Sequence, residues 1–127
     1  MVRCVDYNAA MGSAEKTGRR FSLGEARALL PTVKRVTAEA VRDTEALATR
    51  LHGLDLADPG RQRLSDELEQ IVTRWAHYIQ EMDLEAKGLW LVDFDNGEGY
   101  YCWCYPEESI THYHGYAEGF AGRMKIV

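Results

Sequence analysis

The chain has 127 residues, of which 46% are hydrophobic and 28% are charged, a composition typical of one globular domain. Twenty acidic residues against fifteen basic ones give a net charge of −5, and no Lys/Arg cluster is dense enough to follow a phosphate backbone, so nucleic acid is not an expected partner. The first residues lack the apolar run of a secretory signal, and no apolar stretch approaches the ~20 residues of a membrane helix. We therefore expect a cytoplasmic protein that does not act at a membrane.

Residues 1–20 mix small, polar and charged residues without a helical or strand period, so the sequence predicts a flexible N-terminal arm there. Residues 21–127 are expected to form a single domain. Its first ordered feature is a capping box, in which the hydroxyl of Ser22 accepts a hydrogen bond from the amide of Glu25 and the Glu25 side chain accepts one from the amide of Ser22. This box predicts the start of a helix.

Two amphipathic helices are predicted as a hairpin over residues 22–86, with a turn around Asp58-Pro59-Gly60. Asp58 is the expected N-cap of the second helix and Pro59 its first residue, where a missing amide donor does no harm. Pro31 predicts either a kink in the first helix or a restart after it. Apolar and small residues recur every three or four positions along the first helix, at Ala26, Leu30, Val33, Thr37, Ala40, Thr44, Leu47 and Leu51.

The second helix carries a four-three alternation that resembles a coiled-coil seam, consisting of Leu64, Leu68, Ile71, Trp75, Tyr78 and Met82. A narrow apolar seam is suited to packing against another helix. We therefore predict a homo-oligomer or a helical protein partner, and our first functional hypothesis is a non-enzymatic binding and assembly module that self-associates through its hairpin.

Residues 88–127 change to a period of two, which predicts a β-meander of three antiparallel strands followed by a Gly-rich tail. Asn96-Gly97 favours a two-residue type I′ hairpin turn, and a second turn is expected at residues 106–109. Because directly paired residues share a face, the strands present one aromatic face and one mixed face. The aromatic face, expected to pack on the helices, carries Trp90, Val92, Phe94, Tyr101, Trp103 and Tyr105. The mixed face carries Leu91, Asp93, Tyr100, Cys102 and Cys104.

These elements define an α+β fold, in which a long antiparallel helical hairpin packs on a small three-stranded antiparallel sheet at the C-terminus.

Two pairs of potential metal ligands are Cys102-x-Cys104 and His112-x-His114. Each pair shares a face of its strand, and two cysteines with two histidines suit tetrahedral zinc. A two-residue loop between the strands would send the histidines to the aromatic face, away from the cysteines, whereas a three-residue loop or one bulge would bring both pairs together. The two-residue loop is the simpler solution, so the sequence favours no metal and no cofactor. If a metal is bound, Cys102, Cys104, His112 and His114 are the candidate ligands.

A catalytic hypothesis combines Cys102 as nucleophile, His114 as base and Asp93 as the group that orients the base. No Gly-rich oxyanion loop adjoins Cys102, so spacing alone gives this set little support. Arg123 lies at the end of a segment with three glycines. Its guanidinium is predicted to hold Asp93 or Glu107 in a bidentate pair, or to bind an external carboxylate or phosphate.

Two motifs carry a resemblance to a known family. The first is the opening Phe21-Ser22-Leu23-x-Glu25-Ala26 with Leu29-Leu30-Pro31. The second is a C-terminal signature of Gly88, Val92-Asp93-Phe94, Cys102-Trp103, Glu107, Ile110, His114 and Gly119-Phe120-Ala121-Gly122-Arg123. In both, residues 21–127 resemble the bacterial family called domain of unknown function 2203.

The resemblance implies no reaction, because the family has no established activity, but it favours some candidate residues over others. Asp93, Glu107, His114 and Arg123 match the signature, whereas Cys104 and His112 fall outside it. A polar cluster of those four matching residues is therefore our second functional hypothesis, a small-molecule-binding or enzymatic site with Cys102 as a further candidate.

Overall fold

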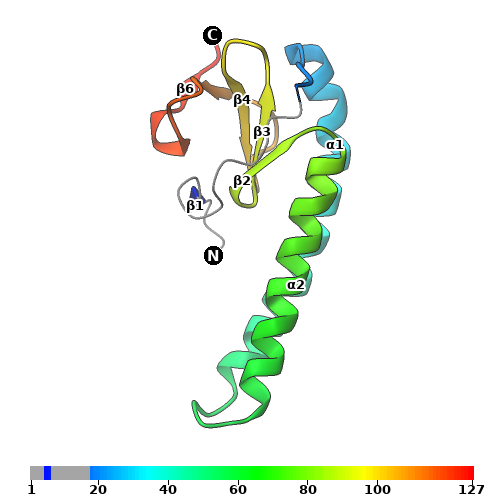
Figure 1. The fold of residues 1–127 in the computed structure, drawn as a ribbon, viewed down its shortest axis with the longest axis vertical. Helices are drawn as coiled ribbons and strands as arrows, with labels where there is room; N and C mark the ends of the chain where they lie inside the picture. The colour runs from blue at the N-terminus through cyan, green and yellow to red at the C-terminus, as the bar shows by residue number, and fades with distance from the viewer. Residues whose placement is uncertain (1–4, 7–17) are drawn as a thin grey trace.

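The computed structural model describes residues 5–6 and 18–127 and shows two long helices beside a twisted antiparallel sheet (Figure 1). The helices are α1 (Leu23–His52) and α2 (Gly60–Glu81). The strands are β1 (Val5–Asp6), β2 (Glu85–Leu89), β3 (Leu91–Asp95), β4 (Tyr100–Cys104), β5 (His112–His114) and β6 (Met124–Lys125), and a short 3₁₀ turn, η1, spans Phe120–Gly122.

The α+β class is confirmed, and the sheet is larger than the predicted meander. Its six strands follow the order β1-β2-β3-β4-β5-β6, and each pairs antiparallel with the next. Apart from β1 and residues 18–20, the predicted N-terminal arm lies outside the described residues. None of the helices in the described part of the chain combines the length and the apolarity needed to cross a bilayer.

The helix starts follow from local side-chain bonds. The capping box is present: the Ser22 hydroxyl accepts from the Glu25 amide at 3.1 Å, and the Glu25 carboxylate accepts from the Ser22 amide at 2.9 Å. α1 continues past Pro31 without a break, so no restart occurs there. α2 begins at Gly60 with Pro59 as its N-cap, one residue later than the predicted N-cap Asp58. The Asp58 carboxylate instead accepts from the Gly60 amide at 2.8 Å in the turn before the helix.

The hairpin is held to the sheet by a buried aromatic contact. The indole N–H of Trp75 donates to the Thr37 hydroxyl at 2.8 Å, and the Trp75 ring lies edge-on to Trp90 with centroids 5.0 Å apart. The next inward position on α2 is Ile79, which is fully buried, whereas Tyr78 is 44% exposed. The seam predicted through Tyr78 assumed a 3.5-residue period, and a straight helix drifts away from that period by ~20° per heptad.

The chain enters the sheet earlier than the predicted boundary at residue 86. α2 ends at Glu81, and Asp83 adopts a left-handed conformation at φ 64° that reverses the chain into β2. Glu85, Ala86 and Lys87 are good helix formers, but burial overrides propensity here. Ala86 packs into the core against the helices, while Glu85 and Lys87 contact Tyr100 on the opposite face.

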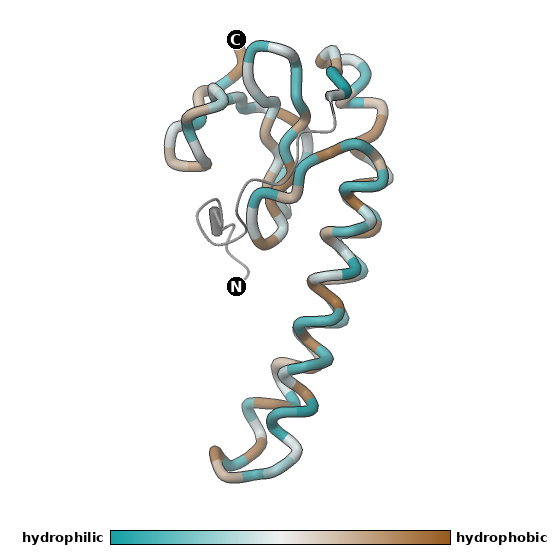
Figure 2. Tube along the Cα trace, viewed as in Figure 1, coloured by the Kyte–Doolittle hydropathy of each residue, from teal (hydrophilic) through white to brown (hydrophobic). Residues whose placement is uncertain are grey.

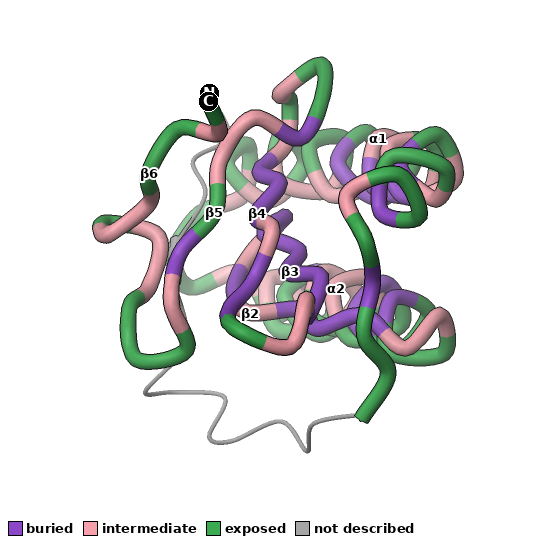
Figure 3. The backbone as a smooth tube through the Cα atoms, turned by 90° about the horizontal axis from the view of Figure 1, so that it is seen from above, coloured by how far each residue is buried: buried purple, intermediate pink, exposed green. Residues whose placement is uncertain are grey.

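The β3–β4 hairpin differs from the prediction in the length of its turn, whereas its side chains lie on the predicted faces of the sheet. Asp95 pairs with Tyr100, so residues 96–99 form the loop and the predicted two-residue turn is wrong. The Asn96 side-chain oxygen accepts from the amides of Glu98 and Gly99, both at 2.8 Å, which stabilises this longer loop. The longer loop shifts the register between β3 and β4 by two residues. Because the shift is even, each side chain stays on its predicted face of the sheet. Figure 3 shows the buried residues gathered on β3, β4 and the inner sides of the helices.

The β4–β5 connection changes the predicted face of the histidines. Tyr100 pairs with His114 and Cys102 pairs with His112. The predicted two-residue loop would instead pair Trp103 with His112, so the register of β5 along β4 is shifted by one residue. The connection spans residues 105–111, because Ile110 is fully buried in the core and the Trp103 indole N–H donates to the Glu107 carbonyl at 2.8 Å. The histidines therefore lie on the face of Cys102 and Asp93, not on the aromatic face.

We expect Thr37→Val to lower the free energy of unfolding by about 1–3 kcal/mol, because the buried Trp75 N–H would lose its acceptor while the side-chain volume stays similar. Urea denaturation measures the loss. Thr49→Val is the matched control, since the Thr49 hydroxyl bonds to the Glu45 carbonyl on an exposed part of the same helix. Equal stabilities of the two variants would contradict a structural role for the Thr37–Trp75 bond.

Candidate functional site

The sheet face turned away from the helices, called the outer face below, carries the polar residues of interest. Asp93, Cys102 and His114 come from the neighbouring strands β3, β4 and β5, and their side chains project to this face because Asp93 pairs with Cys102 and His114 pairs with Tyr100. Residues 115–123 pass over this face, and Phe120 packs near Cys102. The site is thus enclosed between the sheet and the C-terminal segment.

Asp93, Cys102 and His114 form a compact buried group. Their exposed fractions are 1%, 0% and 3%, and one potential ligand atom of each lies within 4.8 Å of those of the other two. The Asp93 Oδ2 atom is 2.9 Å from His114 Nε2. Among the described residues, this is the group of histidine, cysteine and carboxylate side chains with the geometry to hold a metal ion.

The hydrogen bonds of His114 fix its tautomer. Its Nδ1 lies 2.8 Å from the Gly115 carbonyl oxygen, which only accepts, so Nδ1 carries a proton. Nε2 then faces Asp93 either as a lone pair or as the second N–H of an imidazolium. Burial is the largest influence on the pKa of His114 and opposes the charged form, but Asp93 outweighs it, and the pKa is raised.

The carboxylate of Asp93 is the anomaly of the site. Neither of its oxygens accepts a hydrogen bond from any described residue, although the side chain is almost completely buried. The 2.9 Å approach of His114 Nε2 lacks hydrogen-bond geometry and is an electrostatic contact. A buried carboxylate without donors is costly, so a cation or a hydrogen-bond donor beside Asp93 would stabilise it.

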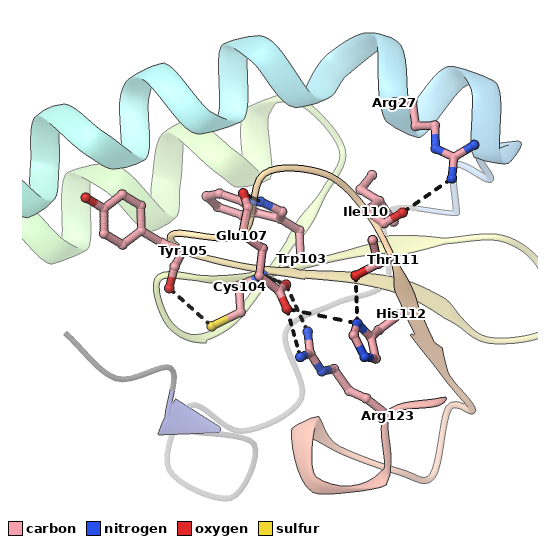
Figure 4. A network of polar contacts seen from close by, with 9 residues as sticks. All are labelled: Arg27, Trp103, Cys104, Tyr105, Glu107, Ile110, Thr111, His112 and Arg123. Carbon is pink, nitrogen blue, oxygen red and sulfur yellow. Dashed lines mark hydrogen bonds and ion pairs between the residues drawn. The ribbon is translucent and has the colours of Figure 1, made fainter. Parts of the chain in front are cut away.

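A second polar pair, Arg123 with Glu107, joins the C-terminal segment to the β4–β5 connection (Figure 4), and Arg123 also lies beside Cys102. The guanidinium of Arg123 binds both oxygens of Glu107, at 3.0 and 2.9 Å, and the Cys104 amide also donates to Glu107 at 2.8 Å. Of the predicted alternatives for Arg123, the structure thus shows the bidentate pair with Glu107. His112 Nδ1 is 2.8 Å from the Thr111 hydroxyl and 4.0 Å from the nearer Glu107 oxygen.

The predicted candidate residues are therefore divided among four surroundings. Asp93 and His114 pair with each other beside Cys102, and Glu107 pairs with Arg123, whose guanidinium also interacts with Cys102. Cys104 is disulfide-bonded, so its sulfur is not available as a thiolate ligand, and His112 is turned to Thr111. The set of two cysteines and two histidines is not assembled as a ligand group.

The nucleophile hypothesis for Cys102 finds little support in this geometry. Both ring nitrogens of His114 already face Gly115 and Asp93, which leaves neither directed to take a proton from the thiol. Burial, followed by the charge of Asp93, raises the pKa of Cys102 far above its usual range. In this arrangement Cys102 stays protonated although the Arg123 guanidinium lies beside its thiol.

Several outer-face residues escaped the sequence analysis. The hydroxyl of Tyr100 donates to Glu85 at 3.2 Å, and Lys87 lies 3.1 Å from the same Glu85 oxygen. Tyr116 donates to Asp95 at 2.6 Å. Glu85 and Lys87 were assigned to the second helix, and their period-two alternation with Ala86 is the signal that would have placed them in a strand.

Comparison with known proteins gives one match. The family model described as "Uncharacterized conserved protein (DUF2203)" matches residues 19–126. No curated protein and no solved structure matches the chain. The family match covers the helical hairpin, β2 to β6 and every residue of the buried group.

We expect His114→Gln in metal-free protein to lower the free energy of unfolding by about 3–5 kcal/mol, because Asp93 would be left as an uncompensated buried charge. Chemical denaturation measures the effect. His77→Gln is the control, since its pair with Glu81 at 2.9 Å is exposed and such pairs contribute about 0–1 kcal/mol. A loss for His114→Gln no larger than that of the control would show that Asp93 and His114 are not energetically coupled.

Proposed function

We propose that this chain, which belongs to the DUF2203 family, binds one divalent transition metal ion of the zinc class through Asp93, Cys102 and His114. The observation that carries the proposal is the buried Asp93 carboxylate, neither oxygen of which accepts a hydrogen bond from a described residue. A cation beside it would satisfy its lone pairs. The same cation would accept the Nε2 lone pair of His114 and turn Cys102 into a thiolate.

The orientation of His114 supports a ligand role. Metal-binding histidines commonly donate their other ring N–H to a carbonyl or carboxylate, which fixes the ring and its tautomer. His114 has this arrangement, with Nδ1 bonded to the Gly115 carbonyl and Nε2 directed at Asp93. One sulfur, one imidazole nitrogen and one carboxylate oxygen form a borderline donor set, which suits zinc better than magnesium or calcium.

The charges of the outer face leave a place for a cation at Asp93. Lys87 is already 3.1 Å from Glu85, and Arg123 is already paired with Glu107. Asp95 accepts the hydroxyl of Tyr116 instead of a cation. Asp93 faces His114 and the thiol of Cys102, so a positive charge in direct contact with its carboxylate would be either the His114 imidazolium or a bound metal.

We expect metal-free protein to take up one equivalent of Zn²⁺, measured by native mass spectrometry, with an increase in melting temperature. Asp93→Asn, Cys102→Ser and His114→Gln should each abolish the increase, whereas the control His112→Gln should keep it. The increase should also vanish as the pH falls, because protons compete for the ligands. An Asp93–His114 ion pair without metal predicts the opposite trend, since the raised pKa of His114 makes its contribution disappear as the pH rises.

Wild-type protein that binds no Zn²⁺ would contradict the proposal. Equal losses for His112→Gln and His114→Gln would do so as well.

A second proposal retains the hairpin as an assembly module. The ends of α1 and α2 remote from the sheet form a two-helix arm (Figure 1) with apolar residues spaced along it (Figure 2). Leu47, Leu51, Leu68 and Ile71 are only half-buried between the two helices. A second copy of the arm would remove this remaining apolar surface from water, which favours a homo-oligomer.

We expect light scattering to show a molar mass above that of the 14.4 kDa chain at micromolar concentration, and Leu68→Gln with Ile71→Gln to return it to the monomer value. Asp66→Asn with Gln70→Glu, on exposed positions of α2, is the control pair. A monomer at all concentrations would contradict self-association.

The cytoplasmic location stays a prediction of the sequence. The disulfide bond at Cys104 weighs against it, because disulfides rarely persist in a reducing cytoplasm.

A further inference from the structure

Two glycines of the C-terminal segment, Gly115 and Gly122, lie against the side chain of Glu118. A Cβ atom at Gly115 would lie 2.8 Å from Glu118 Oε1, and a Cβ atom at Gly122 would lie 3.0 Å from the Glu118 Cβ atom. Neither glycine has a positive φ, so the backbone conformation does not require glycine at these positions. A side chain at either position would press on Glu118, and glycine avoids this contact.

The position of Glu118 is relevant to the proposed metal. Glu118 lines the same small cavity as Asp93 and His114, together with Lys87, Tyr100 and Phe120. The cavity has a volume of ≈ 10 Å³, about the space of a single water molecule. Glu118 lies outside the group whose ligand atoms are within 4.8 Å of one another, so it reaches a metal at Asp93 and His114 through a water and not directly.

Glu118 is exposed to solvent, and its side chain lies against Gly115 and Gly122. The carboxylates of Glu85, Asp95 and Glu107 on the same face each accept a hydrogen bond or form an ion pair with another side chain. Among the described residues, no side chain does the same for the Glu118 carboxylate. Three protein ligands leave a fourth position of a tetrahedral ion for water, the arrangement of catalytic zinc sites. A carboxylate that lines the same cavity can accept a proton from the water.

We propose that Glu118 is the base of this site, accepting a hydrogen bond and then a proton from a water bound to the metal at Asp93, Cys102 and His114. The inference rests on the proposed metal site. In the step, an O–H bond of the water breaks, its proton forms a bond to a Glu118 oxygen, and the hydroxide stays on the metal.

The test uses cobalt(II) in place of zinc, because its visible spectrum reports both binding and the fourth ligand, and azide as a small anion that competes with the bound water. We expect wild-type protein to bind azide weakly and Glu118→Gln to bind it at least about 10-fold more tightly, because the variant lacks the repelling charge. Gly115→Ala, which displaces the Glu118 carboxylate, should shift azide binding in the same direction. Glu98→Gln, in the loop of residues 96–99, is the control and should leave it unchanged.

The outcomes separate the two proposals. If wild-type protein gives no cobalt spectrum, the metal site fails and the role of Glu118 fails with it. If cobalt binds but wild type and Glu118→Gln have equal azide affinities, the metal site stands and the role of Glu118 is overturned. Loss of cobalt binding in Glu118→Gln would also overturn it, since a base acting through water is not a ligand.

Discussion

The register between β4 and β5 is the constraint on which the whole outer face depends. One residue more or less in the connection of residues 105–111 would move His112 and His114 to the aromatic face. The connection is fixed by burial of Ile110 in the helical core and by the bond from Trp103 to the Glu107 carbonyl. Core packing on one side of the sheet therefore determines which polar groups meet on the other.

The apolar side of the sheet also bears an unusual backbone conformation. Trp90 adopts φ 60° between β2 and β3, a conformation that costs a non-glycine residue roughly 1–2 kcal/mol. Trp90 is nevertheless 2% exposed and packs on Trp75, and burial of a large aromatic side chain exceeds that cost. The tight link places β2 directly beside β3, which brings Glu85 and Lys87 onto the outer face.

Much of this architecture is readable from the sequence, and the failures have specific physical causes. The capping box at Ser22 and the alternation from Leu91 to Phe94 depend on local chemistry and periodicity, so they were predicted correctly. β2 was missed because Ala86 and its neighbours favour a helix until tertiary burial decides otherwise. The β4–β5 register depends on a loop whose length is set by Ile110 in a distant core. Glu118 gave no signal, because only the structure shows why Gly115 and Gly122 are glycines.

The buried group of Asp93, Cys102 and His114 is not explained by stability alone. An ion pair removed from water gains little over well-packed apolar residues of the same volume, and the aromatic side of the sheet already supplies an extensive core. Retaining Asp93 without a hydrogen-bond donor is costly for folding alone. If Asp93, Cys102 and His114 bind a cation, the free energy of metal binding offsets the cost of removing all three side chains from water. The hairpin arm lies away from the outer face (Figure 1), so the proposed assembly through the arm and the proposed metal binding would be physically separate.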